Sequence, residues 1–210
     1  MTRENNQKKH IQGVSMLELL IAMAVLGIIV SVAMPSMSEF GANQRLLAAA
    51  EQVHGHIQQA RSEAVARNAP VYVNFSAAGT TTWTYGVSTT NSCTLTISDP
   101  TTANACVVVV NDGDTTVDGM DANGDGTLDV DTGDRVLMRF TSADYSDVEM
   151  AVASFSSGTQ IVFDPVRGTS TSGQINLESS TGRRLRVAVS LLGRSVICSP
   201  DGSVDVYGTC

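Results

Sequence analysis

The 210-residue sequence lacks the short motifs that mark most catalytic and metal-binding sites. It contains no Gly-x-Ser-x-Gly elbow, no phosphate-binding loop, no His-Glu-x-x-His and no Cys-x-x-Cys. Histidine is scarce, and His54 and His56 stand two residues apart, so on a helix they point in different directions and do not form an i, i+4 metal pair. We therefore expect no catalytic activity and place both histidines on the surface of a helix.

Basic residues are also few. The chain has 13 lysines and arginines against 21 aspartates and glutamates, which gives a net charge of −8. Such a balance favours solubility and, taken over the whole chain, disfavours nucleic acid. Internal repeats and low-complexity linkers are absent as well, so the sequence accommodates one helix of membrane-spanning length and one globular domain of ordinary size.

One long apolar run is present near the N-terminus. Residues 14–34 form 21 positions, of which Glu18 is the only ionisable one. A helix of that length measures about 31 Å, close to the thickness of the hydrocarbon core of a bilayer. Basic side chains outnumber acids ahead of the run (Arg3, Lys8 and Lys9 against Glu4). The positive-inside rule then keeps the N-terminus in the cytoplasm and the rest of the chain outside.

Two other interpretations of this run remain open. A secretory signal peptide is also basic and then apolar, and Ser31-Val32-Ala33 has the small residues of a cleavage site. Signal peptides, however, have shorter apolar regions of about 7 to 15 residues, and a carboxylate inside the run costs about 2.5–3.5 kcal/mol on insertion scales. An ordinary single-span anchor is the second alternative, and it gives Glu18 no role.

Three features together resemble the class III signal of type IV pilin-like proteins. They are Gly13, Glu18 five residues after it, and Pro35 at position 22 of the chain that would remain after cleavage. The resemblance implies that residues 1–13 are a leader, that a prepilin peptidase cuts after Gly13, and that the new N-terminal residue, Val14, is N-methylated, although Phe or Met is more usual there. Glu18 would neutralise the terminal amine of a neighbouring subunit during assembly, because both charges are costly when unpaired in lipid.

Beyond Pro35 the apolar positions step by three or four residues, the period of one helix face (Leu46, Ala50, Val53, Ile57, Ala60 and Ala64). This stripe predicts an amphipathic stalk helix over residues 35–68 that ends before Pro70. Joined to the transmembrane or filament-core segment, residues 14–34, it gives one helix of about 80 Å with a kink at Pro35 and Gly41. We expect the stripe to be buried against a sheet.

From residue 70 onward, β-branched and aromatic residues alternate with polar ones between turns rich in Gly, Asn, Asp and Ser. The segments that fit strands are 71–75, 83–87, 94–97, 106–110, 135–140, 148–153, 160–163, 174–177, 185–191, 195–198 and 204–207. They predict a mostly antiparallel sheet. A long helix packed on such a sheet is an α+β architecture, with residues 70–210 as one exported domain.

All four cysteines lie in this exported part, where disulfides persist. Four cysteines allow three connectivities. We favour the two sequence-local pairs, Cys93 with Cys106 and Cys198 with Cys210, each of which would contribute about 3 kcal/mol by closing a short loop. Zinc binding by these sulfurs is the alternative, but no group of Cys and His has the necessary spacing.

Segment 111–134 carries eight aspartates and no basic residue. Within it, Asp121, Asn123, Asp125 and Asp129 occupy positions 1, 3, 5 and 9 of a calcium loop, with glycine at position 6. Position 12 is a threonine, where a bidentate glutamate belongs. We therefore favour a solvated acidic loop with Asx turns and expect at most weak Ca²⁺ binding; no other cofactor is indicated.

Arginines gather farther along the chain, where Glu178 is the only acid between residues 165 and 200. Arg184 and Arg186 would share one face of a strand, and Arg194 would lie at the turn into the next strand. A phosphate-binding face, and hence a DNA site, is one interpretation of these arginines. A solvated sheet face with salt bridges is the other.

Two further segments and one turn resemble a particular branch of the type IV pilin-like proteins. Residues 49–68 and 193–200 look like the minor pilins FimT and FimU, which share the GspH domain of the type II secretion pseudopilins. An Asp-x-Asn-x-Asp-Gly turn before a strand, as in residues 121–126, recurs in this group. Some FimT proteins bind DNA through a C-terminal Gly-Arg-x-Arg motif; here Gly193 and Arg194 match it, and Val196 stands in place of the second arginine.

The resemblance implies a structural subunit, a minor pilin that helps to prime assembly of a type IV pilus, near its tip. Its partners would be the prepilin peptidase, other major and minor pilins or pseudopilins, the inner-membrane assembly platform, and the lipid bilayer before assembly. It would cross the inner membrane once, with residues 70–210 in the periplasm, and then enter the pilus or pseudopilus. A type II secretion pseudopilin is the first alternative. A DNA-binding minor pilin for competence ranks lower, because one arginine of the motif is missing.

Overall fold

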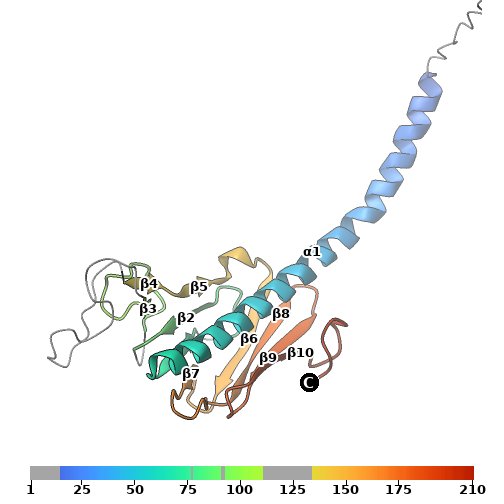
Figure 1. The fold of residues 1–210 in the computed structure, drawn as a ribbon. Helices are drawn as coiled ribbons and strands as arrows, with labels where there is room; N and C mark the ends of the chain where they lie inside the picture. The colour runs from blue at the N-terminus through green and yellow to red at the C-terminus, as the bar shows by residue number, and fades with distance from the viewer. Residues whose placement is uncertain (1–14, 77, 91–92, 111–133) are drawn as a thin grey trace, which may run out of the picture. The chain divides into compact units, whose positions relative to one another are not determined.

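The computed structural model describes residues 15–76, 78–90, 93–110 and 134–210. The chain divides into two compact units, residues 1–40 and 41–210. One helix, α1 (Met16–Arg67), belongs partly to each unit and is followed among the described residues by strands β1 to β10 and a short 3-10 helix, η1 (Ser142–Asp144) (Figure 1). This arrangement confirms the α+β architecture.

Helix α1 is 52 residues long and has a clear end. Asn68 adopts a left-handed conformation (φ 50°), and the N–H groups of Asn68 and Ala69 donate to the carbonyl oxygens of Val65 and Ala64, both at 3.3 Å. A left-handed residue after the last turn is a common helix terminator, and Pro70 prevents further helix. The predicted helix is therefore confirmed from Met16 to Arg67, whereas the kink stays a prediction. Within the described parts of the chain, no helix combines the length and hydropathy expected of a membrane span.

The strands of unit 2 form three antiparallel sheets. The first is ordered β5 (Arg139–Thr141), β2 (Thr84–Ser88), β1 (Val71–Phe75) and β7 (Gln160–Phe163). The second is ordered β10 (Ser195–Cys198), β9 (Arg184–Val189), β8 (Gly173–Ser179) and β6 (Val148–Phe155). A small third sheet pairs β3 (Val107–Val109) with β4 (Arg135–Leu137).

The apolar stripe of α1 forms the centre of the core. Figure 1 shows the part of α1 within unit 2 lying across both four-stranded sheets. All the predicted stripe residues of α1 are buried: Leu46, Ala50, Val53, Ile57, Ala60 and Ala64. Together with Ala49 they form one cluster with the inward-facing residues of the strands. Trp83 Nε1 donates to the Val148 carbonyl oxygen (2.9 Å) and so joins the two large sheets. Burial of each larger aliphatic side chain contributes about 1.5–3 kcal/mol, which fixes the helix on the sheets.

Three strand predictions were wrong in part or entirely. The single strand predicted at 135–140 is divided at Met138 into β4 and β5. The Met138 N–H donates to the Cys106 carbonyl oxygen (2.8 Å), and its carbonyl oxygen accepts from the Val87 N–H (2.9 Å). The chain therefore passes at Met138 from the third sheet to the first. Segment 94–97 is a turn closed by an Ile97 N–H to Thr94 carbonyl bond, and 204–207 is likewise a turn. Both apolar-rich turns lie in short loops closed by disulfides, and such loops are too short for these segments to pair as strands.

Both predicted disulfides are confirmed. Cys93 is bonded to Cys106 and Cys198 to Cys210, and among the described residues no cysteine is free. The first disulfide lies directly over β2 at Gly86, where a Cβ atom would be 2.5 Å from Cys106 Sγ and 2.7 Å from its Cβ. Glycine is therefore required at this strand position by the close approach of the sulfur.

Candidate functional site

The start of α1 has its own capping arrangement. The Glu18 N–H donates to the Ser15 hydroxyl oxygen (3.2 Å) and to the Ser15 carbonyl oxygen (3.1 Å). Ser-x-x-Glu is the capping-box pattern, and a carboxylate in the first turn also interacts favourably with the helix dipole. Sequence reasoning missed this local role of Glu18, although the Ser15 spacing was visible. The Ser15 side chain therefore caps the helix start, and the Glu18 carboxylate in the first turn interacts favourably with the helix dipole.

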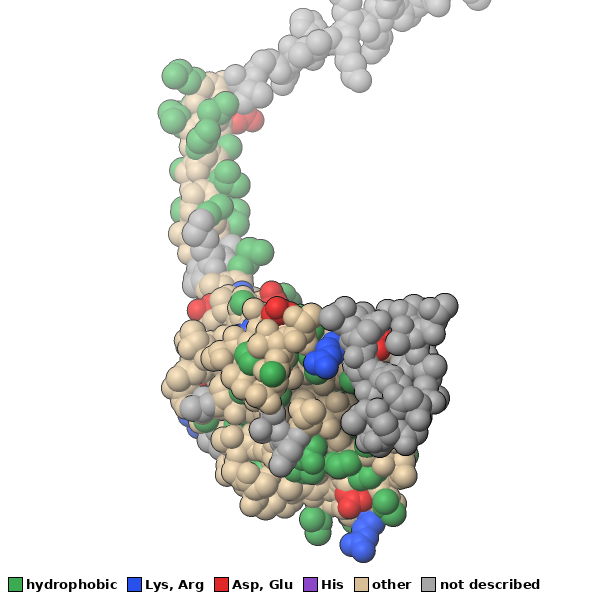
Figure 2. Space-filling model, turned by 90° about the vertical axis from the view of Figure 1, so that its left-hand side faces the viewer, with side chains coloured by type: hydrophobic (Ala, Val, Ile, Leu, Met, Phe, Trp, Pro, Cys, Tyr) green, Lys and Arg blue, Asp and Glu red, His purple; other side chains and the backbone are tan. Residues whose placement is uncertain are grey.

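The first part of α1 exposes its apolar side chains on all sides. Between residues 16 and 31 every large apolar side chain is exposed, from 41% at Val30 to 86% at Met16. Figure 2 shows these hydrophobic side chains covering the face of this segment that is in view. A helix that is apolar all round needs lipid or other helices around it, because water would otherwise contact the whole surface.

Gly13, Val14 and Pro35 are the other residues predicted to take part in processing and assembly. Gly13 and Val14 lie outside the described residues, so cleavage and methylation stay predictions. Pro35 lies within the helical backbone of α1, and it lacks the N–H that would donate to the carbonyl one turn earlier. Its role in assembly also stays a prediction.

The two histidines of α1 are half-buried, which corrects the expectation that they lie on the surface. His54 donates from Nε2 to the Ser195 carbonyl oxygen (3.2 Å). His56 Nδ1 lies 2.8 Å from the Tyr85 hydroxyl oxygen, and its ring stacks on Phe140 with centroids 3.8 Å apart. Burial lowers the pKa of His56 and raises that of Tyr85, so both groups are neutral near pH 7. The histidines join α1 to the sheets, and neither lies in a metal cluster of the described residues.

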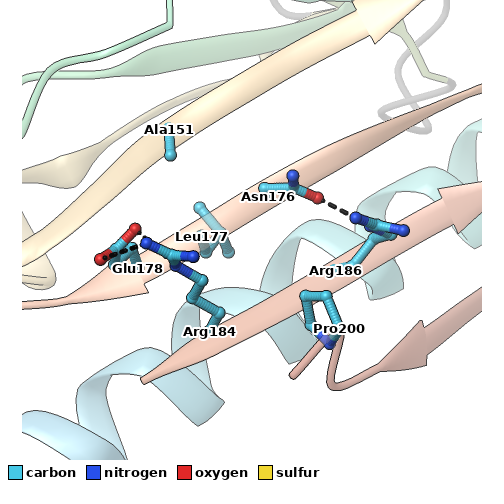
Figure 3. Close-up of a pocket in the computed structure, with 7 residues that line it drawn as sticks. All are labelled: Ala151, Asn176, Leu177, Glu178, Arg184, Arg186 and Pro200. Atoms are coloured by element: carbon cyan, nitrogen blue, oxygen red, sulfur yellow. Dashed lines mark hydrogen bonds and ion pairs between the residues drawn. The ribbon is translucent and has the colours of Figure 1, made fainter. Parts of the chain in front are cut away.

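Arg184 and Arg186 share one face of β9, as predicted, and their side chains are engaged by residues of β8. Arg184 bonds both carboxylate oxygens of Glu178 (2.9 and 3.2 Å), and Arg186 donates from Nε to the Asn176 side-chain oxygen (2.9 Å). Figure 3 shows these cross-strand pairs. They line a pocket of about 240 Å³ together with Ala151, Leu177 and Pro200. Glu178 raises the pKa of Arg184 through the hydrogen bonds and the charge attraction. The geometry matches a salt-bridged, solvated face better than an open phosphate site.

Arg194 does not join these two arginines. It precedes β10, and the adjacent Ser195 pairs with Val189 at the far end of β9 from Arg184. Five residues of extended chain separate Arg184 from Val189, about 17 Å. Arg194 instead lines a groove with Leu192 and Val196. Arg184 and Arg194 therefore lie near opposite ends of β9.

The predicted calcium ligands Asp121, Asn123, Asp125 and Asp129 lie outside the described residues, so calcium binding stays a prediction. Val110 and Asp134 adjoin the two ends of the acidic segment 111–133. The Val110 N–H donates to the Asp134 carbonyl oxygen (2.8 Å), next to the pairing of β3 with β4. Among the residues that the structure describes, no group of His, Cys, Asp and Glu is arranged to hold a metal ion.

Comparison with known protein families matches two parts of the chain. A model for the prokaryotic N-terminal methylation motif matches residues 8–34, and a model for the type II transport protein GspH matches residues 49–193, more than half of the chain. The chain belongs to the GspH family. Neither curated proteins nor solved structures gave a significant match to this GspH-family protein.

The two matches fit the geometry. The methylation motif covers the second half of the predicted leader and the exposed apolar part of α1. The GspH match covers α1 from residue 49 and the strands up to the turn at Gly193. Together they confirm the resemblance to type IV pilin-like proteins of the GspH type. A prepilin-type motif implies processing and assembly with other pilins or pseudopilins, and this family is structural rather than enzymatic.

Proposed function

We infer that this GspH-family protein is a minor pilin that helps to prime assembly of a type IV pilus and lies near its tip. The observation that carries the proposal is the prepilin-type motif of residues 8–34 on an exposed apolar helix that continues into a GspH domain. In this proposal the helix spans the inner membrane once, with its N-terminus in the cytoplasm, before the subunit is taken up by the assembly platform.

Assembly would be favoured because two opposite charges neutralise each other where no water solvates them. Cleavage after Gly13 creates a terminal ammonium group on Val14, four residues before the Glu18 carboxylate. An ammonium and a carboxylate are each costly in lipid when unpaired, and pairing between subunits removes both penalties. The exposed aliphatic side chains of residues 16–31 would supply the remaining contact between helices.

The first test is the intact mass of the chain from membranes of its host. The mature chain should lack residues 1–13 and carry one added methyl group. Cleavage after Ala33 instead would identify a secreted protein and contradict the proposal.

The second test separates the two roles of Glu18. Glu18→Gln retains a capping-box side chain but removes the charge, whereas Glu18→Val removes both. If the charge drives assembly, both variants should be processed and both should be reduced in sheared filament fractions to a similar extent. Normal incorporation of Glu18→Gln with loss of Glu18→Val would show that the residue acts only as a helix cap.

A second candidate is a type II secretion pseudopilin. It is favoured by the description of the matched family, a type II transport protein. Deletion of the gene in its host distinguishes the two. Loss of pili with normal protein secretion supports the minor pilin, and loss of secretion with normal pili supports the pseudopilin.

A further inference from the structure

Two neighbouring turns of unit 2 expose apolar and basic side chains together. The turn between β7 and β8 presents Val166 and Arg167, and the turn between β9 and β10 presents Leu191, Leu192 and Arg194; we call these five residues the turn surface. Val166 is 82% exposed, Leu191 64% and Leu192 70%. Both arginines are exposed, and neither guanidinium group has an ion-pair partner among the described residues. Aliphatic and arginine side chains exposed in this way are typical of an interaction site.

The two turns are held together by backbone contacts. Gly193 has φ +71°, and a Cβ atom there would lie 2.5 Å from the Gly168 carbonyl oxygen and 3.0 Å from Arg61 Nε. The Ser170 N–H donates to the Leu191 carbonyl oxygen (3.0 Å). Figure 2 shows hydrophobic side chains next to charged ones at the lower edge of unit 2. The turn surface is therefore built on a fixed backbone.

The turn surface lies at the end of unit 2 that is remote from the point where the chain joins unit 1. Asn43 contacts Thr181, in the turn between β8 and β9, through their side-chain oxygens (3.4 Å). Gln58 donates to the Ser195 hydroxyl oxygen (2.8 Å) at the start of β10, beside the turn surface. These two helix positions are about 22 Å apart. The segment predicted to enter the membrane joins unit 2 at Gly41, so lipid headgroups would lie near the opposite end.

The chemistry of the turn surface favours a protein over a nucleic acid. Useful affinity for DNA requires several phosphate contacts, whereas this surface has two arginines, with Arg61 as a third beside Gly193, on a chain of net charge −8. Asp164 also lies in the first turn, where its carboxylate accepts from the N–H groups of Val166 and Arg167 (2.9 and 3.0 Å). Three exposed aliphatic side chains match an apolar protein face, and the two cations match carboxylates around it.

We propose that the turn surface docks a neighbouring subunit of the same filament, through aliphatic side chains and carboxylates at the end of that subunit where its helix joins its sheet domain. This inference rests on the proposed function. The corresponding end of this chain has a groove of about 180 Å³ lined by Asp147, Glu149 and Glu178. Asp147 is paired with Arg45 and Glu178 with Arg184, so of these three carboxylates Glu149 illustrates the kind required of the partner. Contacts between opposite ends of successive subunits are heterologous, and contacts of this kind can extend into an open filament.

The experiment places the photoreactive residue p-benzoylphenylalanine at position 192 of the full chain in its native host. Irradiation should give an adduct with a second protein that carries a prepilin-type N-terminus, and mass spectrometry should place the crosslink beside carboxylates at the helix end of its sheet domain. The double change Arg167→Glu and Arg194→Glu should reduce the yield about tenfold, because it opposes like charges across the contact.

Two controls make the result specific. Arg183→Glu makes the same charge change in the turn between β8 and β9, where Arg183 is also exposed, and it should leave the yield unchanged. The photoreactive residue at Val206, which is 73% exposed and lies in the loop closed by Cys198 and Cys210, should not give the same adduct. Both disulfides are checked on non-reducing gels, so a misfolded variant is recognised.

Absence of an adduct from chains with intact disulfides would overturn the inference. So would adducts only with DNA, with lipid or with proteins of another class, or a yield unaffected by the double charge change. The loss of residues 1–13 is measured in the same membranes. A processed chain without the adduct refutes only the docking surface, whereas an unprocessed chain refutes the proposed function.

Discussion

Gly86 provides a sensitive test of the packing between β2 and the first disulfide. In Gly86→Ala the new Cβ atom would lie 2.5 Å from Cys106 Sγ, 2.7 Å from Cys106 Cβ and 3.3 Å from a terminal carbon of Leu95. Sγ cannot move far because it is bonded to Cys93, so the strand or the loop has to shift. Overpacking of this kind lowers the free energy of unfolding by about 1–3 kcal/mol. In a domain of this size that corresponds to a fall in Tm of about 2–12 °C.

The assay is thermal unfolding of the full chain in detergent micelles. Trp83 is the only tryptophan and is 1% exposed, so its fluorescence reports the core of unit 2. Gly55→Ala is the matched control: Gly55 lies in α1 with no atom within 4 Å of a built Cβ, and its substitution should raise the free energy of unfolding by about 1 kcal/mol.

A double-mutant cycle identifies the source of the loss. In the Cys93→Ala and Cys106→Ala background the nearest contact is removed and the loop is no longer tied, so Gly86→Ala should be less destabilising there. An equal loss in both backgrounds, or no loss in the native one, would refute the argument that the sulfur requires glycine at this position.

Three other predictions concern titration and ligands. Burial lowers the pKa of His56 below its ordinary 6.5, so as the pH falls the imidazole is protonated in the unfolded chain before it is protonated in the folded one. The free energy of unfolding, measured at equilibrium, should therefore decrease as the pH drops below 6.5. His56→Gln should make this decrease smaller. The full chain should bind DNA weakly or not at all in about 150 mM salt, because Arg184 and Arg186 are already engaged; a mobility shift at low micromolar protein that disappears in Arg194→Ala would contradict this. Calorimetry should show calcium binding no tighter than about 10⁻⁴ M, and submicromolar affinity would prove the acidic segment a genuine site.

Local periodicity was enough to predict most of the fold. The stripe from Leu46 to Ala64 placed one face of α1 on the sheets, and alternation located β1, β7 and β10. The division of segment 135–140 could not be predicted, because it depends on the hydrogen bond that Met138 donates to Cys106 and the one it accepts from Val87, and both partners are distant in sequence. Apolar alternation alone does not say which strand is the partner.

The candidate sites were predicted less completely, for similar reasons. The sequence spacing correctly put Arg184 and Arg186 on one strand face, but it did not show that Glu178 and Asn176 lie opposite them. His56 was assigned to the surface because its contacts with Tyr85 and Phe140 come from other elements. The turn surface joins two turns that are adjacent only in the folded chain.

The pairing of β3 with β4 has a consequence for how this protein can vary. Val110 and Asp134 are brought together by that ladder and by their own backbone hydrogen bond, and the disulfide at Cys106 secures the same place. The entropy of closing a connection between fixed ends grows only slowly, by about 0.6 kcal/mol for each doubling of its length. Both ends of the connection between positions 110 and 134 are therefore held by unit 2 itself, so a variant lengthened between them should keep the pairing of β3 with β4.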